Sequence, residues 1–165
     1  MIVVSDASPL ITLAKIGRLE LLPQLYQTIA ITPQVYDEVA VKGSGLPGSA
    51  EVAASKWITV KPVHNPEDLA AEQRRFGLAI GELSAIVLGR ELSAGLVLID
   101  EIKARKAAQD RGLAVLGCVG VLESAFRSRL LSDLRHAYAQ LLGSGAYVDP
   151  SILENSLKAM KLPPL

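Results

Sequence analysis

Short, mainly apolar runs that alternate with amphipathic segments constrain the fold of this chain most. The runs are three or four residues long and lie at residues 2–4, 28–31, 57–60, 96–99 and 113–116. Strands that are apolar on both faces are typical of parallel sheets, which helices cover on either side. The sequence therefore predicts an α/β fold with a buried parallel sheet and helices between its strands.

The predicted helices fill the intervals between the strands without a low-complexity linker or an internal repeat. Two of them begin with the same signal, a hydroxyl residue followed by proline, at Ser8–Pro9 and Thr32–Pro33. The hydroxyl can cap the helix, and proline is tolerated at the first helical position. Further helices are expected at residues 18–26, 49–55, 66–76, 82–92, 102–111, 119–129, 132–142 and 150–160.

The balance of charges limits the ways in which this chain can bind nucleic acid. It has 165 residues, with 17 Lys and Arg against 17 Asp and Glu, so its formal net charge is zero. A protein that coats nucleic acid usually needs a basic excess, whereas an enzyme can use bound metal ions to attract phosphate. Small basic groups remain at residues 74–75, 103–106 and 127–129.

The single cysteine and the absence of long apolar runs indicate the cellular setting. Cys118 alone cannot form an internal disulfide or a cysteine-based zinc site, and we interpret it as a small buried residue at a helix start. No apolar run is long enough to span a bilayer, and the first residues do not resemble a secretory signal. We therefore expect a cytoplasmic protein that does not enter membranes.

Acidic residues follow two of the predicted strands. Asp6 ends the first strand, and Asp100 with Glu101 follows the strand at residues 96–99. The carboxyl ends of parallel strands meet at one edge of the sheet, where ligands bind. Glu82, at a helix start, and Glu38, on the helix after the second strand, could join them. Clustered carboxylates repel one another unless a cation neutralises them, and Mg²⁺ or Mn²⁺ suits such oxygen ligands.

A metal site of this kind would suit hydrolysis of phosphodiester bonds. The metal polarises the phosphodiester and lowers the pKa of a bound water, so no protein nucleophile is required. The sequence offers no convincing nucleophile of its own.

Four segments, in this order, resemble the motifs of PIN-domain proteins. The first is VSDASPLI at residues 4–11, and the second is PQVYDEV at residues 33–39. The third is GELSAI at residues 81–86, and the fourth is LIDEIKAR at residues 98–105. The following GLAVLG at residues 112–117 is similar to the last strand of that domain. The resemblance covers residues 2–130 and is closest to a poorly characterised branch of PIN-like proteins.

The resemblance implies a fold, an activity and a set of site residues. The fold would be a three-layer α/β/α domain at residues 1–130 with about five parallel strands. Residues 131–165, which the resemblance does not cover, are helical by pattern and would form a C-terminal helical extension of the same domain. The activity would be that of a metal-dependent endoribonuclease, often the toxin of a VapC-type toxin–antitoxin pair. An antitoxin protein would then be a partner, and homodimerisation through the helices near residues 11–25 is expected.

Carried over residue by residue, the resemblance assigns the metal ligands. They would be the carboxylates of Asp6, Glu38, Glu82 and Asp100, with Glu101 at the rim. Ser8 would support the metal or its water through its hydroxyl, and Arg105 would contact phosphate. Two features depart from the family pattern: Glu82 stands where many members have Asp, and Glu101 is an additional acid.

Each of these side chains also has an ordinary structural interpretation. Asp6 can shape a turn, and Glu82 can complement a helix N-terminus. Asp100 and Glu101 can cap the next helix. The second motif offers two candidate metal ligands, because Asp37 is adjacent to Glu38. Glu38 can also be an ordinary solvated residue on the outer face of a helix.

Arg105, the one basic residue among the candidate site residues, also has an ordinary structural interpretation. Arg105 is four residues after Glu101, so a helical ion pair competes with phosphate binding.

Two rival functions stay open at this point. A catalytically silent PIN-like module could keep the acidic pocket and bind nucleic acid or protein. A small-molecule phosphatase would need a second Asp after Asp6, where Ala7 and Ser8 stand. Residues 43–48 fit a dinucleotide fingerprint by letter but follow a predicted helix, and His64 and His136 have no companions at ligand spacing.

Overall fold

A wholly parallel, five-stranded sheet forms the centre of the computed structural model, which describes residues 1–165. The strands are β1 (Val3–Ser5), β2 (Ile29–Ile31), β3 (Ile58–Val60), β4 (Leu96–Leu98) and β5 (Val115–Leu116). Their order in the sheet is β3-β2-β1-β4-β5. The predicted parallel sheet and its five strands are confirmed.

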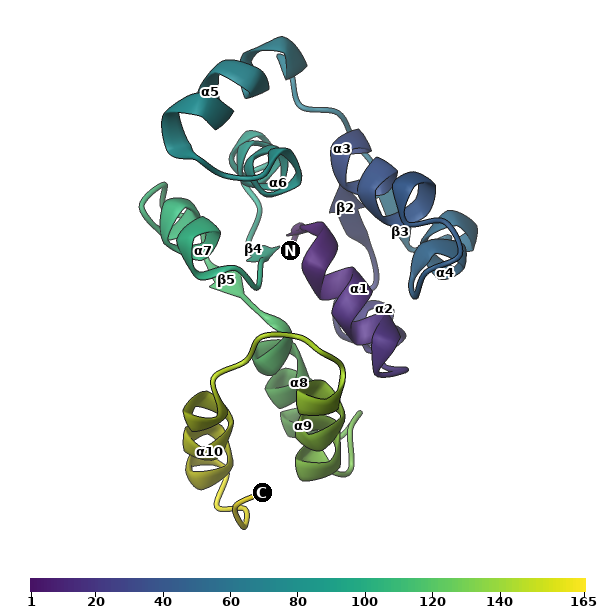
Figure 1. The fold of residues 1–165 in the computed structure, drawn as a ribbon, viewed down its shortest axis with the longest axis vertical. Helices are drawn as coiled ribbons and strands as arrows, with labels where there is room; N and C mark the ends of the chain where they lie inside the picture. The colour runs from purple at the N-terminus through teal and green to yellow at the C-terminus, as the bar shows by residue number, and fades with distance from the viewer.

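Each strand is followed by one or more helices (Figure 1). The first half contains α1 (Ala7–Lys15), α2 (Leu21–Tyr26), α3 (Pro33–Tyr36), the π-helix η1 (Asp37–Lys42) and α4 (Ser49–Ala54). The middle contains the 3₁₀ turn η2 (Pro66–Asp68), α5 (Leu69–Phe76), α6 (Ile80–Glu91) and α7 (Ile102–Gln109). The last part contains α8 (Cys118–Arg127), α9 (Leu134–Gly143) and α10 (Pro150–Ala159).

The two faces of the sheet bury different apolar clusters. Alternate strand residues point to opposite faces, so Val4 and Val97 join the side chains of α6 and α7, while Val3 and Leu98 join those of α1 and α8. Both faces are thus covered by helices, and the expected three-layer α/β/α fold is confirmed.

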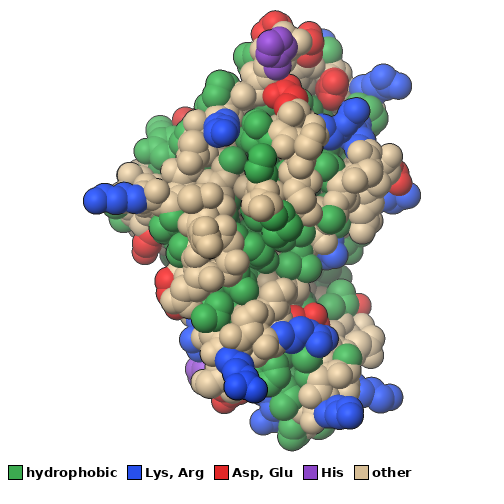
Figure 2. Space-filling view, turned by 180° about the vertical axis from the view of Figure 1, so that it is seen from behind, with side chains coloured by type: hydrophobic (Ala, Val, Ile, Leu, Met, Phe, Trp, Pro, Cys, Tyr) green, Lys and Arg blue, Asp and Glu red, His purple; other side chains and the backbone are tan.

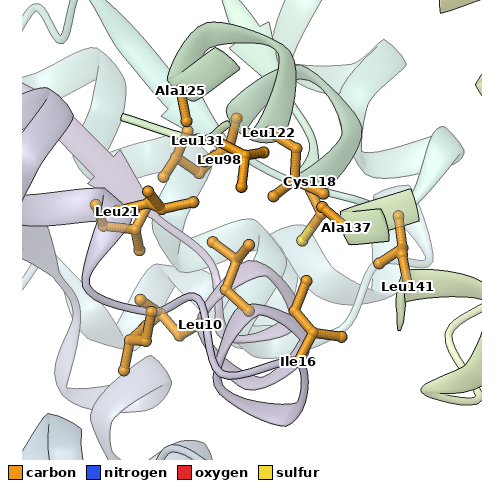
Figure 3. Close-up of a cluster of buried hydrophobic side chains, with 14 of the residues drawn as sticks. Leu10, Ile16, Leu21, Leu98, Cys118, Leu122, Ala125, Leu131, Ala137 and Leu141 are labelled. Carbon is orange, nitrogen blue, oxygen red and sulfur yellow. The ribbon is translucent and has the colours of Figure 1, made fainter. Parts of the chain in front are cut away.

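The C-terminal helices belong to the larger of these clusters. Figure 1 shows α8, α9 and α10 together at one end of the molecule. Ala137 and Leu141 of α9 lie in the same cluster as Leu10 and Ile16 near α1 (Figure 3). The hydroxyls of Tyr138 and Ser156 lie 2.6 Å apart and connect α9 to α10. Residues beyond 130 therefore share the core of the preceding residues.

One predicted helix start is wrong. The sequence placed a cap at Ser8, but α1 begins at Ala7 and Asp6 occupies the N-cap position. The β1–β4 pairing extends to the Asp6 amide, which donates to the carbonyl of Leu98 at 2.9 Å. The chain therefore turns immediately after Asp6, and Pro9 lies within the first turn, where a missing N–H breaks no helical bond.

Two other helices differ from the prediction in form. The helix after Pro33 widens to a π-helix at Asp37, and α6 begins at Ile80, so that it includes Gly81, where a break was expected. The cap at Thr32 is confirmed, because its hydroxyl accepts the Val35 N–H at 3.1 Å. None of the helices combines the length and apolarity needed to cross a bilayer.

Candidate metal centre

Asp6 and Asp100 come from neighbouring strands at the point where the strand order reverses. β1 lies between β2 and β4, so the chain leaves β1 toward one side of the sheet and returns on the other. Asp6 directly follows β1, and Asp100 lies two residues after β4. Open parallel sheets bind ligands at such switch points. Asp6 is only 3% exposed, so its carboxylate lies at the bottom of the site.

Glu38 reaches the same place from the other side, over Gly81. A Cβ atom built on Gly81 would lie 2.8 Å from Glu38 Oε2 and 3.4 Å from Asp6 Oδ1. The Glu38 and Asp6 carboxylates therefore approach each other over Gly81, and they can do so because this residue has no side chain. Asp37 instead pairs with Lys42 at 3.3 Å, so of the two adjacent acids it is Glu38 that faces Asp6.

A buried hydroxyl pair fixes the elements that carry Glu38 and Gly81. The hydroxyls of Thr32 and Ser84 lie 2.7 Å apart, and both residues are fully buried. Thr32 caps α3, and the Ser84 hydroxyl donates to the Gly81 carbonyl at 2.8 Å. This pair connects the end of β2 to the first turn of α6. Neither residue was predicted from the sequence to belong to the site, although the Thr32–Pro33 cap was a visible signal.

Asp100 is held by the N-terminus of α8. Its Oδ1 accepts the Cys118 N–H at 2.6 Å, and the Cys118 Sγ lies 3.1 Å from Oδ2. A Cβ on Gly117 would lie 2.8 Å from Asp100 Oδ1 and 3.4 Å from Arg105 Nη1, so these two side chains approach each other there. Cys118 is buried at a helix start, as predicted, and burial beside Asp100 raises the pKa of its thiol.

Glu82 and Glu101 both cap helices, as the structural interpretation anticipated. Glu82 Oε2 accepts the Ala79 N–H at 3.1 Å, and Glu101 Oε2 accepts the Ala104 N–H at 2.7 Å. Each capping bond uses one carboxylate oxygen and leaves the other free for a second ligand.

The acids affect one another electrostatically. Burial raises the pKa of Asp6 to about 7, opposed by a hydrogen bond from the Ala7 amide, and the charges of Glu82, Glu38 and Asp100 add to the rise. Burial also raises the pKa of Glu82, with contributions from Glu101 and Glu38, while Lys103 lowers it. The acids are thus close enough to repel one another, while Asp6 alone among them is fully buried.

None of these carboxylates forms an ion pair with a basic side chain. The ion pairs of the chain are Lys42–Asp37 and Lys106–Asp110. Arg105, half-buried, therefore forms neither the helical pair with Glu101 nor a pair with Asp100. Ser8 is exposed in the first turn of α1, two residues after Asp6.

The carboxylates fit a hard divalent cation, although they are not gathered around one point. No group of three or more His, Cys, Asp or Glu side chains is arranged to hold a metal ion as they stand. The donor set is purely carboxylate oxygen, which suits Mg²⁺ or Mn²⁺, and two of the donors, Glu38 and Asp6, approach each other over Gly81. Glu38 is exposed and Glu82 half-exposed, so rotation of these side chains can bring their oxygens inward.

A family model described as a PIN domain matches residues 2–162. The chain therefore belongs to the PIN-domain family, a nuclease-type family whose members generally depend on divalent metal. The match includes α9 and α10, beyond the segment in which the motifs were found. The search of curated proteins found no match.

Proposed function

We propose that this chain is a metal-dependent endoribonuclease that hydrolyses phosphodiester bonds in RNA. The observation that carries the proposal is the set of carboxylates at the strand-order switch, of which Glu38 and Asp6 approach each other over Gly81 and none forms an ion pair with a side chain of the protein. Asp6, Glu38, Glu82 and Asp100 would hold Mg²⁺ or Mn²⁺, with Glu101 at the rim.

The chain's own residues would divide the work between holding the ion and orienting the substrate. Bound metal would supply positive charge for the phosphate and a water of lowered pKa. Buried Asp6 provides a fixed oxygen, because the Asp6 amide is tied to β4, and Asp100 is oriented by the Cys118 amide. The exposed Ser8 hydroxyl would hold a water next to Asp6.

Two basic side chains without ion-pair partners adjoin the acids. Arg105 lies near Asp100, and the charge of Lys103 acts on Glu82. A cation that is not committed to a carboxylate is free to bind a phosphate oxygen. Arg105 is therefore assigned to phosphate binding in this proposal, since the competing pair with Glu101 is not formed.

The wider biological role follows the family resemblance. We propose a cytoplasmic toxin of a toxin–antitoxin pair, with an antitoxin protein as its partner. A homodimer is part of this proposal, but most apolar side chains expected at its interface are inside the chain itself. Leu13, Leu19, Leu21 and Leu22 are each at most 6% exposed.

The alternative function is a silent binding module with the same fold. It is favoured by one observation, that the carboxylates are not gathered into a ready-made metal group. Such a module would bind its partner equally well with and without metal, and it would cut no RNA.

Cleavage of end-labelled single-stranded RNA in Mg²⁺ or Mn²⁺ tests the proposal. Wild type should cut, and Asp6→Asn and Asp100→Asn should each lose the activity. Asp110→Asn is the matched control, because Asp110 pairs with Lys106 on the surface of the chain. If RNA stays intact with both metals, or if the site variants cut like wild type, the nuclease assignment fails and the binding module is favoured.

A further inference from the structure

Three basic side chains gather around Phe76, where the end of α5 meets α7. The guanidinium carbon of Arg111 lies 4.3 Å from the centre of the Phe76 ring, and that of Arg75 lies 5.3 Å from it. Lys103 Nζ lies 3.4 Å from the carbonyl of Gly77, the next residue in the chain. We call Arg75, Lys103 and Arg111 the α5–α7 cation cluster.

The cation cluster forms no ion pair within the protein, although the charge of Lys103 also acts on Glu82. Neither of the chain's ion pairs includes one of these three residues. Arg75 and Lys103 are exposed and Arg111 is half-exposed, so their charged groups face solvent. On the face of the molecule that Figure 2 shows, both acidic and basic side chains occur among hydrophobic and uncharged atoms.

One of these side chains, Arg111, is also held in place. The Arg111 Nη1 donates to the carbonyl of Ala107 at 2.8 Å, and its guanidinium stacks on the aromatic ring. A guanidinium held by an aromatic face keeps its edge N–H groups for an anion, and little side-chain entropy remains to be lost on binding. The stacking of arginine on Phe76 also covers part of the ring, so this surface suits a phosphate backbone better than a stacked base.

The cation cluster continues directly into the acidic site. The chain runs from Phe76 through Gly77 to Glu82 in six residues, and Glu82 caps the intervening turn at Ala79. Lys103 follows Glu101 by two residues at the start of α7, so it stands between the acids and the two arginines. A strand bound at the acids would pass over these cations when it leaves toward α5.

We propose that the α5–α7 cation cluster binds the sugar–phosphate backbone of the RNA strand on one side of the bond that is cut. This inference rests on the proposed nuclease function for the identity of the strand. Binding there is independent of base sequence, because all three groups contact phosphate rather than base edges. The cluster gives a chain without net charge a local means of holding an anionic polymer.

Binding of a short fluorescein-labelled oligouridine in EDTA tests this surface without cleavage. The triple variant Arg75→Gln/Lys103→Gln/Arg111→Gln should bind about tenfold more weakly than wild type at low salt. The slope of log K against log salt concentration should fall by about 2, since each lost phosphate contact in a single strand contributes about 0.7. The double variant Arg75→Gln/Lys103→Gln, which changes only exposed side chains, should show an intermediate loss and an unchanged melting temperature.

A variant with the same change in net charge provides the control. Arg127→Gln/Arg129→Gln/Lys158→Gln removes three exposed charges at the α8–α10 end and should bind like wild type. Equal weakening by both triple variants, or wild-type binding by the α5–α7 variants, would overturn the inference. If wild type cuts RNA and the α5–α7 variants have the same KM, RNA binding by the cation cluster is refuted while the proposed nuclease function is supported. If neither wild type nor any variant cuts RNA but only the α5–α7 variants lose RNA binding, binding by the cation cluster is supported and the nuclease function is refuted.

Discussion

Asp6 carries an electrostatic cost that a counter-charge would remove. Its carboxylate is buried and has acidic neighbours, which raise its pKa from 3.8 to about 7. Folding therefore favours the protonated form, and the contribution of this group to stability is lost as the pH rises from about 4 to about 7. Above pH 7 the metal-free chain folds with a buried, unpaired charge, and a divalent cation would compensate for it.

We predict that Asp6→Asn stabilises the metal-free protein at pH 8. The neutral amide resembles the protonated acid in shape, so the gain should be up to about 4 kcal/mol, the order expected for a shift of this size in a buried group. Urea unfolding in EDTA at pH 8 and pH 4 measures it, and the difference from wild type should vanish at pH 4.

The same variant should lose the response to metal. Mn²⁺ should raise the melting temperature of wild type and leave that of Asp6→Asn unchanged, because binding to the folded state alone stabilises it. A destabilised Asp6→Asn protein at pH 8, or one that still gains stability from Mn²⁺, would contradict the assignment of Asp6 as a ligand.

Gly81 gives a second prediction at this scale, since the carboxylates of Glu38 and Asp6 approach each other over it. In a helix, Ala is generally more stable than Gly by up to about 1 kcal/mol. The exposed Glu38 carboxylate can rotate away from the new methyl group. Gly81→Ala should therefore fold with equal or higher stability but bind Mn²⁺ about tenfold more weakly, as calorimetry would show.

Gly143→Ala is the control for this substitution. It lies on α9, and a Cβ there meets no atom within 4 Å. Its affinity for Mn²⁺ should equal that of wild type. Unchanged metal affinity in Gly81→Ala would show that the ion does not occupy the space above Gly81.

The candidate ligands were visible in the sequence, but their surroundings were not. Asp6 and Asp100 follow apolar strands, and the topology of a parallel sheet brings such positions together. The role of Gly81 depends on the approach of η1 to α6, and that of Thr32 and Ser84 on a contact between residues 52 positions apart. Single-sequence patterns contain only local spacing, so contacts of this kind could not be predicted from them.

At the scale of elements, the π-helix η1 orients the second-motif acid. It begins directly after α3 and contains both Asp37 and Glu38. Insertion of a wider turn rotates the following residues around the axis, and such π turns are frequent at functional sites. The sequence predicted a helix here but could not show which of the two acids faces the site, because the change from α-helix to π-helix at Asp37 has no recognisable sequence pattern.

The Thr32–Ser84 hydroxyl pair is the contact that holds α3 and η1 against α6. We predict that Thr32→Val, which keeps the shape of the side chain, destabilises the protein by about 1–3 kcal/mol. The cap of α3 is lost and the Ser84 hydroxyl loses a partner inside the core. Urea unfolding measures this loss, and weaker Mn²⁺ binding should accompany it because Glu38 is less well placed.

Ser124→Ala provides the comparison for this loss. The Ser124 hydroxyl donates only to the carbonyl four residues earlier, within α8, at 2.8 Å. Its removal should cost less than Thr32→Val and leave metal binding unchanged. Equal metal affinity in wild type and Thr32→Val would show that the hydroxyl pair does not position the site.

At the scale of the whole molecule, one core joins the sheet to the last helices. Leu153 and Leu157 of α10 are fully buried in the cluster that contains Leu10 of α1 (Figure 3 shows part of it). The prediction of a C-terminal helical extension at residues 131–165 was made from amphipathic spacing alone. Its boundary at residue 130 stays a prediction, whereas the family match runs through residue 162.

Removal of α9 and α10 should therefore unfold the protein rather than leave a shorter folded domain. Truncation after residue 130 exposes the apolar surface of α8 that α9 covers, and we expect a chain without a cooperative thermal transition. Tyr138→Phe, which breaks only the bond to Ser156, should cost about 1 kcal/mol. A truncated chain that melts cooperatively near the wild-type temperature would show that the last helices are dispensable for the fold.

The most direct test of the central claim compares two neighbouring acids of η1 in the RNA cleavage assay. Asp37 pairs with Lys42, whereas Glu38 faces Asp6 across Gly81. With Mn²⁺ present, Asp37→Asn should cut RNA at nearly the wild-type rate, and Glu38→Gln should lose most of the activity. Equal activity of the two variants, or cutting by wild type in EDTA, would contradict a metal-dependent nuclease built on these carboxylates.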